Sequence, residues 1–289
     1  MKKTGEMKMG YKIISKRRLN DTVTQMDILA PYVAAKAEAG QFIILRVTDD
    51  GERIPLTVAG CDREKGTVNI IFQTVGATTF ELSLKNEGEE IEDFSGPLGR
   101  PTETDGLERV CVVGGGVGCA IALPIARKLF EKGCEVDAIV GFRNKDLVIL
   151  EDEFRKSSNT FTLMTDDGTA GRKGLVTEPL KEILESGKKY DKVIAIGPLV
   201  MMKFVVETCR PFGVPTVVSM NPIMIDGTGM CGGCRLTVGG KTHFACVDGP
   251  EFDGYAVDFD EAISRSSIYR DFEKHAYETE CNLFKGATK

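Results

Sequence analysis

Residues 109–132 read RVCVVGGGVGCAIALPIARKLFEK, and this stretch decides the fold. The apolar run at its start predicts a buried strand at 109–113. Four glycines follow at positions 114–118, and the apolar residues that return after them predict a helix at 117–132. The glycines and Pro124 interrupt the segment too often for a membrane span. We therefore interpret it as a strand, a tight turn and a helix of a parallel α/β sheet.

The glycine turn is the predicted nucleotide site. Glycines let the backbone approach a pyrophosphate, and the following helix N-terminus supplies N–H groups. The turn does not satisfy G-x-G-x-x-G, since Cys119 holds the last position, and an ordinary tight turn is the alternative. Other strand ends of the same sheet are further candidates, because ligands of open α/β sheets bind there. The predicted nucleotide contacts are Gly114, Gly115, Gly116, Val117, Gly118, Asp167, Gly168, Gly197, Pro198 and Met201. For Met201 and Met202, core packing is an equal alternative.

The sequence on either side of this unit shows two other patterns. Strands and helices alternate up to residue 220, which predicts a doubly wound parallel sheet. Residues 11–91 instead carry six short β-branched and apolar segments, which fit an antiparallel barrel better than a sandwich. A turn-rich connection at 95–107 separates the two, and a hairpin at 235–246 precedes a charged helical tail. We predict domains at 1–102, 103–220 and 221–289.

The expected elements of the parallel sheet have defined ranges. They are strands at 109–113, 135–142, 160–165, 192–196 and 216–220, and helices at 117–132, 151–156, 175–186 and 199–212.

A second motif, DGTGMCGGC, lies at residues 226–234, with Cys246 beyond it. With a cysteine in place of Asp226, the spacing would be that of a plant-type [2Fe-2S] protein. A carboxylate can also ligate iron, and glycines let the loop wrap a small inorganic core. The predicted cluster ligands are Asp226, Cys231, Cys234 and Cys246.

Zinc is the alternative metal for this loop, because three cysteines and one further ligand also suit zinc. The fourth ligand would most naturally be His243, but His243 and Cys246 lie close together on the predicted hairpin. A Rieske centre needs two histidines, and the other histidine, His275, lies in the tail. The pattern therefore favours the iron–sulfur interpretation, with His243 as an ordinary hairpin residue.

Composition narrows the class of protein further. The 289 residues carry a formal net charge of -6 and no run of Lys or Arg, which argues against nucleic acid as a partner. The N-terminus has no apolar segment that could act as a signal peptide, so we expect a cytoplasmic protein without a membrane span. Clustered cysteines in that compartment indicate metal or redox chemistry. The dispersed Cys61, Cys111, Cys119, Cys134 and Cys209 are expected in the core, and Cys281 as a tail thiol.

The barrel carries a third motif, with the sequence RIPLT at 53–57. An Arg beside a Thr on a strand can pair with a diphosphate and hydrogen-bond a ring heteroatom. A predicted Gly-x-Thr-Thr turn, which contains Gly76, Thr78 and Thr79, offers further donors. Taken alone, these residues are better explained as a surface Arg and an ordinary turn, and their spacing does not establish a flavin site.

These motifs occur in an order that resembles the ferredoxin reductase-like electron-transfer subunits. The likeness covers nearly the whole chain. It is to the electron-transfer subunit of dihydroorotate dehydrogenase B and, more closely, to the small subunit of NADH-dependent reduced ferredoxin:NADP oxidoreductase. Asp226, which stands where the dihydroorotate subunit has a cysteine, is the residue that favours the second.

The resemblance implies an FAD-binding antiparallel β-barrel, a Rossmann-like NAD(P) domain and a small [2Fe-2S] domain. It assigns FAD contacts, with Thr57 as the predicted catalytic residue. The implied FAD contacts are Arg53, Pro55, Leu56, Thr57, Ile71, Phe72, Gln73, Gly76, Thr78 and Thr79. NAD(H) is implied on this subunit and NADP(H) on its partner, although Arg143 could attract a 2′-phosphate and Glu151 or Asp152 could bind ribose hydroxyls.

The implied function is that of an oxidoreductase subunit active in a heteromeric complex. Hydride passes between NAD(H) and FAD, and single electrons pass between FAD and the cluster. The implied partner is a larger FAD and [4Fe-4S] subunit that resembles the glutamate synthase small subunit, with ferredoxin serving the complex and electron bifurcation on that partner. The alternatives are the dihydroorotate dehydrogenase B subunit and, more distantly, a non-enzymatic zinc module.

Overall fold

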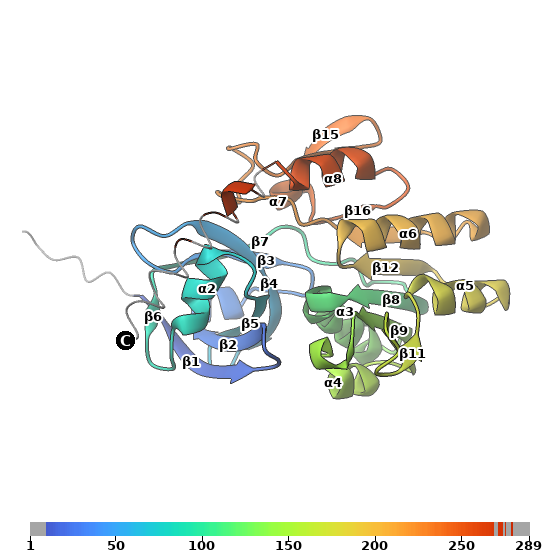
Figure 1. Ribbon diagram of the computed structural model, residues 1–289, viewed down its shortest axis with the longest axis horizontal. Helices are drawn as coiled ribbons and strands as arrows, with labels where there is room; N and C mark the ends of the chain where they lie inside the picture. Colours follow the sequence, from blue (N-terminus) through green and yellow to red (C-terminus); the bar gives the residue numbers. More distant parts are fainter. Residues whose placement is uncertain (1–9, 269–270, 274, 276–278, 280–289) are drawn as a thin grey trace, which may run out of the picture.

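The computed structural model describes residues 10–268, 271–273, 275 and 279. Figure 1 shows a barrel, a sheet covered by helices, and a small C-terminal part that lies across both. Cys281 and the end of the predicted helical tail lie outside the described residues, whereas residues 259–266 of that tail form a helix. Within them, no helix combines the length and the apolar character needed to cross a bilayer.

The N-terminal part is an antiparallel sheet curled into a nearly closed barrel. Its order is β6-β1-β2-β5-β4-β3-β7, so that strands adjacent in the sequence lie at the two edges. The strands are β1 (Tyr11–Arg18), β2 (Val23–Leu29), β3 (Phe42–Arg46), β4 (Arg53–Asp62), β5 (Thr67–Gln73), β6 (Glu90–Ile91) and β7 (Asp93–Leu98). The helices are α1 (Pro31–Ala34) and α2 (Ala77–Leu84). Alternate strand residues such as Ile13, Met26 and Ile70 fill the core, and the predicted barrel is confirmed.

Two details of the barrel differ from the sequence prediction. The connection expected at 95–107 begins later, because residues 95–98 belong to β7 and pair with β3. The Gly-x-Thr-Thr segment is the start of helix α2, with Gly76 as its N-cap, and not a free turn. Neither composition favours the structure that is observed. Glycine and proline in the first segment disfavour a strand, and β-branched threonines in the second disfavour a helix, so the sequence pattern did not predict these elements.

The second part is the predicted parallel sheet, in the order β11-β10-β9-β8-β12-β13-β16. Its strands are β8 (Arg109–Gly115), β9 (Glu135–Phe142), β10 (Thr160–Thr165), β11 (Arg172–Lys173), β12 (Lys192–Ile196), β13 (Thr216–Ser219) and β16 (Glu251–Asp253). The helices are η1 (Gly116–Gly118), α3 (Cys119–Glu131), η2 (Lys145–Leu147), α4 (Glu151–Lys156), α5 (Thr177–Glu185), α6 (Leu199–Cys209) and η3 (Arg210–Phe212). Strands β9, β10 and β12 match their expected ranges residue for residue.

Helices cover both faces of this sheet. In β8, Val110 and Val112 pack with α3 and α4, whereas Cys111 and Val113 pack with α5 and α6. The period of two residues explains how one apolar strand serves two cores. The edge strand β16 runs antiparallel to β13 and comes from the C-terminal third of the chain. It has three residues, too few for a periodic signal.

The C-terminal part is held to the sheet by β16. It also contains the hairpin β14 (Arg235–Val238) and β15 (Lys241–Phe244), and the helices α7 (Ala245–Asp248) and α8 (Phe259–Ser266). The hairpin was predicted, and His243 lies on it beside the ring of Phe252.

Four of the five dispersed cysteines are buried, as predicted. They are Cys111, Cys119, Cys134 and Cys209. Cys61 is only partly buried, and burial raises the pKa of its thiol to about 11.

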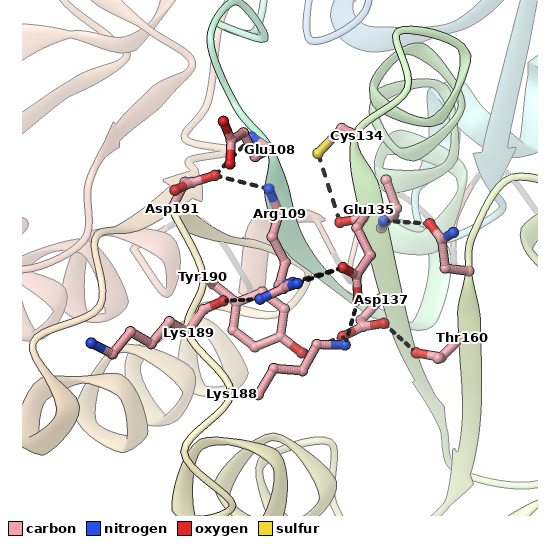
Figure 2. Close-up of polar contacts among 12 residues, drawn as sticks. Glu108, Arg109, Cys134, Glu135, Asp137, Thr160, Lys188, Lys189, Tyr190 and Asp191 are labelled. Carbon is pink, nitrogen blue, oxygen red and sulfur yellow. Dashed lines mark hydrogen bonds and ion pairs between the residues drawn. The ribbon is translucent and has the colours of Figure 1, made fainter.

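The amino edge of the parallel sheet holds a network of charges (Figure 2). Asp137 on β9 is 1% exposed and accepts hydrogen bonds from Lys188, Tyr190 and Thr160. Lys188 also pairs with Glu135 at 3.0 Å. Each buried polar side chain in the described residues has a hydrogen-bond partner, so this network is satisfied at every atom that water cannot reach.

Candidate functional site: a cleft between barrel and sheet

A cleft of about 780 Å³ opens where the barrel faces the carboxyl edge of the parallel sheet. Its walls combine residues far apart in the sequence, because β4 and β5 form one side and the ends of β8, β9 and β12 form the other. Most predicted FAD and nucleotide contacts line it. These are Pro55, Leu56, Thr57, Ile71, Phe72, Gln73, Thr79, Gly115, Gly116, Val117, Gly118, Gly197, Pro198 and Met201.

The glycine turn forms the floor of the cleft, and its shape requires glycine. Gly116 has a φ of +55°, in the left-handed region. A Cβ on Gly118 would lie 2.6 Å from the carbonyl oxygen of Ile196, and a Cβ on Gly115 would lie 2.2 Å from Met201 Sδ. The turn therefore packs directly against the loop between β12 and α6. The turn leads into the N-terminus of α3, and such a position suits an anion.

Three predicted nucleotide residues lie outside the cleft wall. Gly114 is buried in β8, and a Cβ there would lie 2.9 Å from Cys119 Sγ. Asp167 and Gly168 belong to the turn after β10, where the Asp167 carboxylate accepts hydrogen bonds from the amide and hydroxyl of Thr169. These bonds hold the pKa of Asp167 below its usual value. The two methionines divide, since Met202 is in the core and Met201 lines the cleft.

The barrel wall is mostly apolar, and Thr57 offers it a polar group free to bind a ligand. Thr57 on β4 lines the cleft, and among the described residues its hydroxyl has no hydrogen-bond partner. Thr79 also lines it, but its hydroxyl accepts the amides of Val75 and Gly76, each at 3.0 Å, and so caps helix α2. Thr78 is buried in α2. Only part of the predicted donor set therefore faces the cleft.

Arg53 lies at the amino end of β4, outside the residues that line the cleft. Its Nη2 is 3.4 Å from Asp93 Oδ2, and half of the side chain is exposed. Asp93 has a closer partner in Arg46, at 2.7 Å. The contact of Arg53 is thus the weaker of two, and an exposed pair of this kind contributes little to stability.

Several cleft residues were not predicted from the sequence. Asn20 and Thr22 come from the turn before β2, while Leu147 ends η2 and Ile149 lies in the loop before α4. Their types carry no motif, and only the tertiary approach of barrel and sheet brings them together. Asp166 also faces the cleft, and its place at a strand end was a usable signal; Arg143, which the sequence suggested as a 2′-phosphate contact, faces the cleft as well.

The predicted cluster loop begins at Asp226, whose carboxylate organises it. One oxygen accepts hydrogen bonds from the hydroxyl and amide of Thr228, and the other accepts the amides of Met230 at 3.2 Å and Cys231 at 3.0 Å. The Thr228 hydroxyl and the Cys231 amide hold the pKa of Asp226 well below its usual range. These four bonds use the lone-pair positions of a carboxylate, so iron ligation would replace at least one of them.

The loop brings together two of the three predicted cysteine ligands. Cys234 and Cys246 are buried with their thiols in hydrogen-bond contact, whereas Cys231 is exposed. Burial and the Cys234 thiol raise the pKa of Cys246 to about 12. Across residues 10–268, no three His, Cys, Asp or Glu side chains converge as a metal site. The donor set suits an iron–sulfur cluster, and the left-handed glycines Gly227, Gly229 and Gly232 suit a wrapped loop.

Comparisons with known proteins agree with this architecture. Residues 221–258 match the family model of the iron–sulfur cluster binding domain of dihydroorotate dehydrogenase B. A solved structure of the NADH-dependent reduced ferredoxin-NADP oxidoreductase, studied for flavin-based electron bifurcation, is 45% identical with a TM-score of 0.88. That match covers 95% of this chain and 99% of the other. An Amycolatopsis cytochrome P450 reductase, 22% identical with a TM-score of 0.58, shares the fold.

Two curated relatives extend the likeness in sequence. The "uncharacterized protein in adh 3′region" of Clostridium beijerinckii is 50% identical, over 92% of this chain and 93% of the relative. The electron-transfer subunit homolog of dihydroorotate dehydrogenase B (NAD(+)) from Thermotoga maritima is 48% identical, over 92% and 94%. Fold and relatives define a ferredoxin reductase-like oxidoreductase subunit. The chain belongs to the family of dihydroorotate dehydrogenase B electron-transfer subunits and their homologues.

Proposed function

We propose that the chain is the electron-transfer flavoprotein subunit of an NADH-dependent reduced ferredoxin:NADP+ oxidoreductase. The observation that carries this proposal is the cleft in which the glycine turn and the barrel wall face each other, on a chain that also holds the cysteine loop. The 45% identity to the bifurcating oxidoreductase over nearly the whole chain favours this complex among electron-transfer systems. FAD would exchange hydride with NAD(H), and the [2Fe-2S] cluster would exchange single electrons with FAD.

The residues of this chain would position these groups. Thr57, whose hydroxyl lacks a partner in the described structure, would hydrogen-bond the flavin ring from the barrel wall. The amides of Gly116 and Val117 would bind the pyrophosphate of NAD(H) at the start of α3. Arg53 would exchange its 3.4 Å contact with Asp93 for the FAD diphosphate, at small cost because Arg46 stays with Asp93.

The cluster ligands would be Asp226 with Cys231, Cys234 and Cys246. The buried Cys234 and Cys246 already lie in contact, and the glycine-rich loop would turn the exposed Cys231 toward them. An oxygen ligand is harder than a thiolate, so Asp226 would shift the cluster potential relative to a four-cysteine site. We further propose a cytoplasmic complex in which a larger FAD and [4Fe-4S] subunit carries the bifurcation and the NADP(H) site.

Visible and EPR spectroscopy of the anaerobically purified full chain test the proposal. We expect flavin and [2Fe-2S] bands that NADH bleaches. Asp226→Ala should lose or weaken the cluster signal, and Asp226→Cys should retain it with a changed EPR spectrum. A colourless, zinc-loaded protein would refute the proposal. If both variants gave the same spectra as the wild type, Asp226 would not be a cluster ligand.

A matched pair of variants tests the flavin wall. Thr57→Ala should slow flavin reduction by NADH while the cluster stays intact, because the ring loses its hydrogen bond. Thr242→Ala, on the exposed face of the C-terminal hairpin, serves as the control and should keep the wild-type rate. Equal rates in the two variants would remove Thr57 from the site.

The second candidate is the electron-transfer subunit of dihydroorotate dehydrogenase B, which the Thermotoga maritima relative and the matched cluster domain favour. Both candidates use the same chemistry on this chain, so the partner decides between them. Co-purification of the native complex should recover a large subunit with FAD and [4Fe-4S] clusters. Recovery of a catalytic subunit that oxidises dihydroorotate would establish the second candidate.

A further inference from the structure

The connection from the barrel to the parallel sheet forms a joint with the C-terminal part of the chain. It runs along the segment that follows the last predicted cluster ligand. The amide of Arg100 donates to the carbonyl oxygen of Gly249 at 2.7 Å, and its Nε donates to that of Val247 at 3.3 Å. Two residues further on, the Thr102 hydroxyl donates to the Glu251 carboxylate at 2.5 Å. The connection therefore contacts every second residue of this segment.

The same connection is fastened to the barrel. The amide of Thr102 donates to the carbonyl oxygen of Ala39 at 2.9 Å. The next barrel residue, Gly40, has a φ of +87°, and a Cβ there would lie 2.2 Å from Thr102 Oγ1 and 3.2 Å from Glu251 Oε1. Barrel, connection and β16 thus meet at the bond between Thr102 and Glu251, with no room for a methyl group.

The carboxylate at this joint depends on its partner. Glu251 is partly buried, and burial raises its pKa, whereas the Thr102 bond acts in the opposite direction. The charge of Lys192 favours the ionised form more weakly, and that of Glu103 opposes it. A buried acceptor that loses its donor carries the full cost of its lost hydration. Removal of the Thr102 hydroxyl therefore favours opening of the joint to water.

The joint lies between the cleft and the cysteine loop. Pro250, the residue before Glu251, lines the cleft, and so does Phe42 of the barrel. A Cβ on Gly99 would lie 2.8 Å from Phe42 Cε1 and 3.0 Å from Pro250 Cδ, so the connection packs against both. Cys246, the last predicted cluster ligand, precedes Pro250 by four residues. A shift of this short segment would change the distance between the cleft and the cysteine loop.

We propose that Thr102 and Glu251 are positioning residues for electron transfer between the flavin and the cluster. The proposal rests on the proposed function. Their hydrogen bond holds the segment after Cys246 against the barrel, and the rate of electron transfer falls steeply with the distance between two redox groups. The hydride of NADH brings two electrons, of which one passes to the cluster and one stays on the flavin until the cluster is reoxidised. Thr102 and Glu251 act through the segment that they hold, without contact to either group.

Laser-flash photoreduction tests this role in the anaerobic full chain loaded with FAD and cluster. The flash delivers one electron to the chain, and absorbance follows the exchange of that electron between flavin and cluster. Thr102→Val keeps the shape of the side chain without its hydroxyl, and it should slow the exchange by at least about fivefold. The rate of flavin reduction by NADH and the EPR spectrum of the reduced cluster should match the wild type. Thr102→Ser restores a hydroxyl and should recover most of the wild-type rate.

A control variant and a second measurement accompany this test. The Ser15 hydroxyl donates to the Asp27 carboxylate at 2.6 Å within the barrel alone, so Ser15→Ala removes the same kind of bond away from the joint. It should leave the electron-transfer rate unchanged. Amide hydrogen exchange should become faster at 99–103 and 247–251 in Thr102→Val, because the joint opens, whereas β8 and β9 should stay protected.

The outcomes separate the joint from the function. The inference is overturned by an electron-transfer rate in Thr102→Val within about twofold of the wild type, by an equal loss in Ser15→Ala, or by unchanged amide exchange at the joint. It is also overturned if Thr102→Val alters the cluster spectrum or slows flavin reduction, because the bond would then support a cofactor site. A wild-type chain that binds no FAD or no cluster would overturn the proposed function instead. Amide exchange on that chain would still decide whether Thr102 holds the joint.

Discussion

The two edges of the parallel sheet have opposite character. The amino edge carries a dense charge network in which Asp137, Lys188 and Tyr190 are all partnered (Figure 2). The carboxyl edge carries glycines, an apolar cleft and two charges without partners in the described structure, Arg143 and Asp166. The same strands, β8 to β10 and β12, run between the two edges.

This difference separates stability from binding. Groups at the amino edge have exchanged water for protein partners, so their removal leaves buried charge unpaired. Groups at the carboxyl edge remain open and can lose water only to a ligand. We therefore expect substitutions at the amino edge to lower the free energy of unfolding while nucleotide affinity is kept. Substitutions at the carboxyl edge should affect binding.

The largest effect is expected for Lys188→Met. It leaves the buried Asp137 without its cation, and the loss of one partner from such a pair lowers the free energy of unfolding by about 3 kcal/mol. Urea denaturation followed by circular dichroism measures this. Lys181→Met, at an exposed position of α5, is the control and should change stability by less than about 1 kcal/mol. NAD+ affinity should match the wild type, and a parallel loss of affinity would show that the edges are coupled.

Gly118→Ala should act on both properties. The new Cβ would lie 2.6 Å from the Ile196 carbonyl oxygen, so backbone must move and the free energy of unfolding should fall by about 2 kcal/mol. Because the moved segment is the floor of the cleft, NAD+ affinity should fall at least about tenfold. Gly60→Ala is the control, since its Cβ has 3.8 Å to Asn69. Retained affinity in Gly118→Ala would remove the glycine turn from the nucleotide site.

The two edges also differ in how much of their structure the sequence predicts. The strand, turn and helix at the carboxyl edge are written in consecutive residues, so the fold and the floor of the cleft were predictable. The approach of segments that are far apart in the sequence was not predictable. Asn20 lines the cleft from the barrel side, and β16 joins the sheet from the C-terminal third of the chain. No local sequence pattern predicts either position. Arg53 likewise lies outside the cleft wall, and the residue it contacts, Asp93, is forty residues away in the sequence.

The charge network at the amino edge was not predicted from the sequence, for a related reason. Asp137 interrupts an apolar strand, and its partners Lys188 and Tyr190 sit in a polar segment that resembles an ordinary surface loop. A buried charge and its counter-ion carry no fixed spacing, so only the approach of the segment before β12 to β9, across β8, reveals them. The cysteine loop is the opposite case, because the spacing of its predicted ligands is a local pattern within residues 226–246.

Tyr190→Phe should have a smaller effect than Lys188→Met. It removes one of three donors to Asp137 and preserves the ring and the cation, so we expect a loss of about 1.5 kcal/mol in the free energy of unfolding. Tyr255→Phe is the matched control, because the Tyr255 hydroxyl donates to the neutral carbonyl of Val214. Its loss should lower the free energy of unfolding by about 1 kcal/mol. A Tyr190→Phe protein as stable as the wild type would mean that the hydroxyl adds nothing to the network.

The smallest expected effect concerns acid. Burial raises the pKa of Asp137, but hydrogen bonds from Lys188, Thr160 and Tyr190 outweigh it, and the net direction is below the ordinary value of 3.8. A folded pKa below the unfolded one adds stability that is present above about pH 4 and is lost as the pH falls through the folded value. Because burial and the hydrogen bonds act in opposite directions on the carboxylate, the stability gained from this shift is small.

The stability difference between the wild type and Asp137→Asn should therefore be constant near neutral pH and narrow below about pH 4. Asp21→Asn controls for general acid effects, because Asp21 is an exposed carboxylate whose oxygens have no partner among the described residues. Its difference from the wild type should stay near zero throughout. Urea denaturation at pH 7, 5, 4 and 3 measures both. If the Asp137→Asn difference widened in acid, the carboxylate would be protonated more easily when folded, and burial rather than hydrogen bonding would dominate the amino edge.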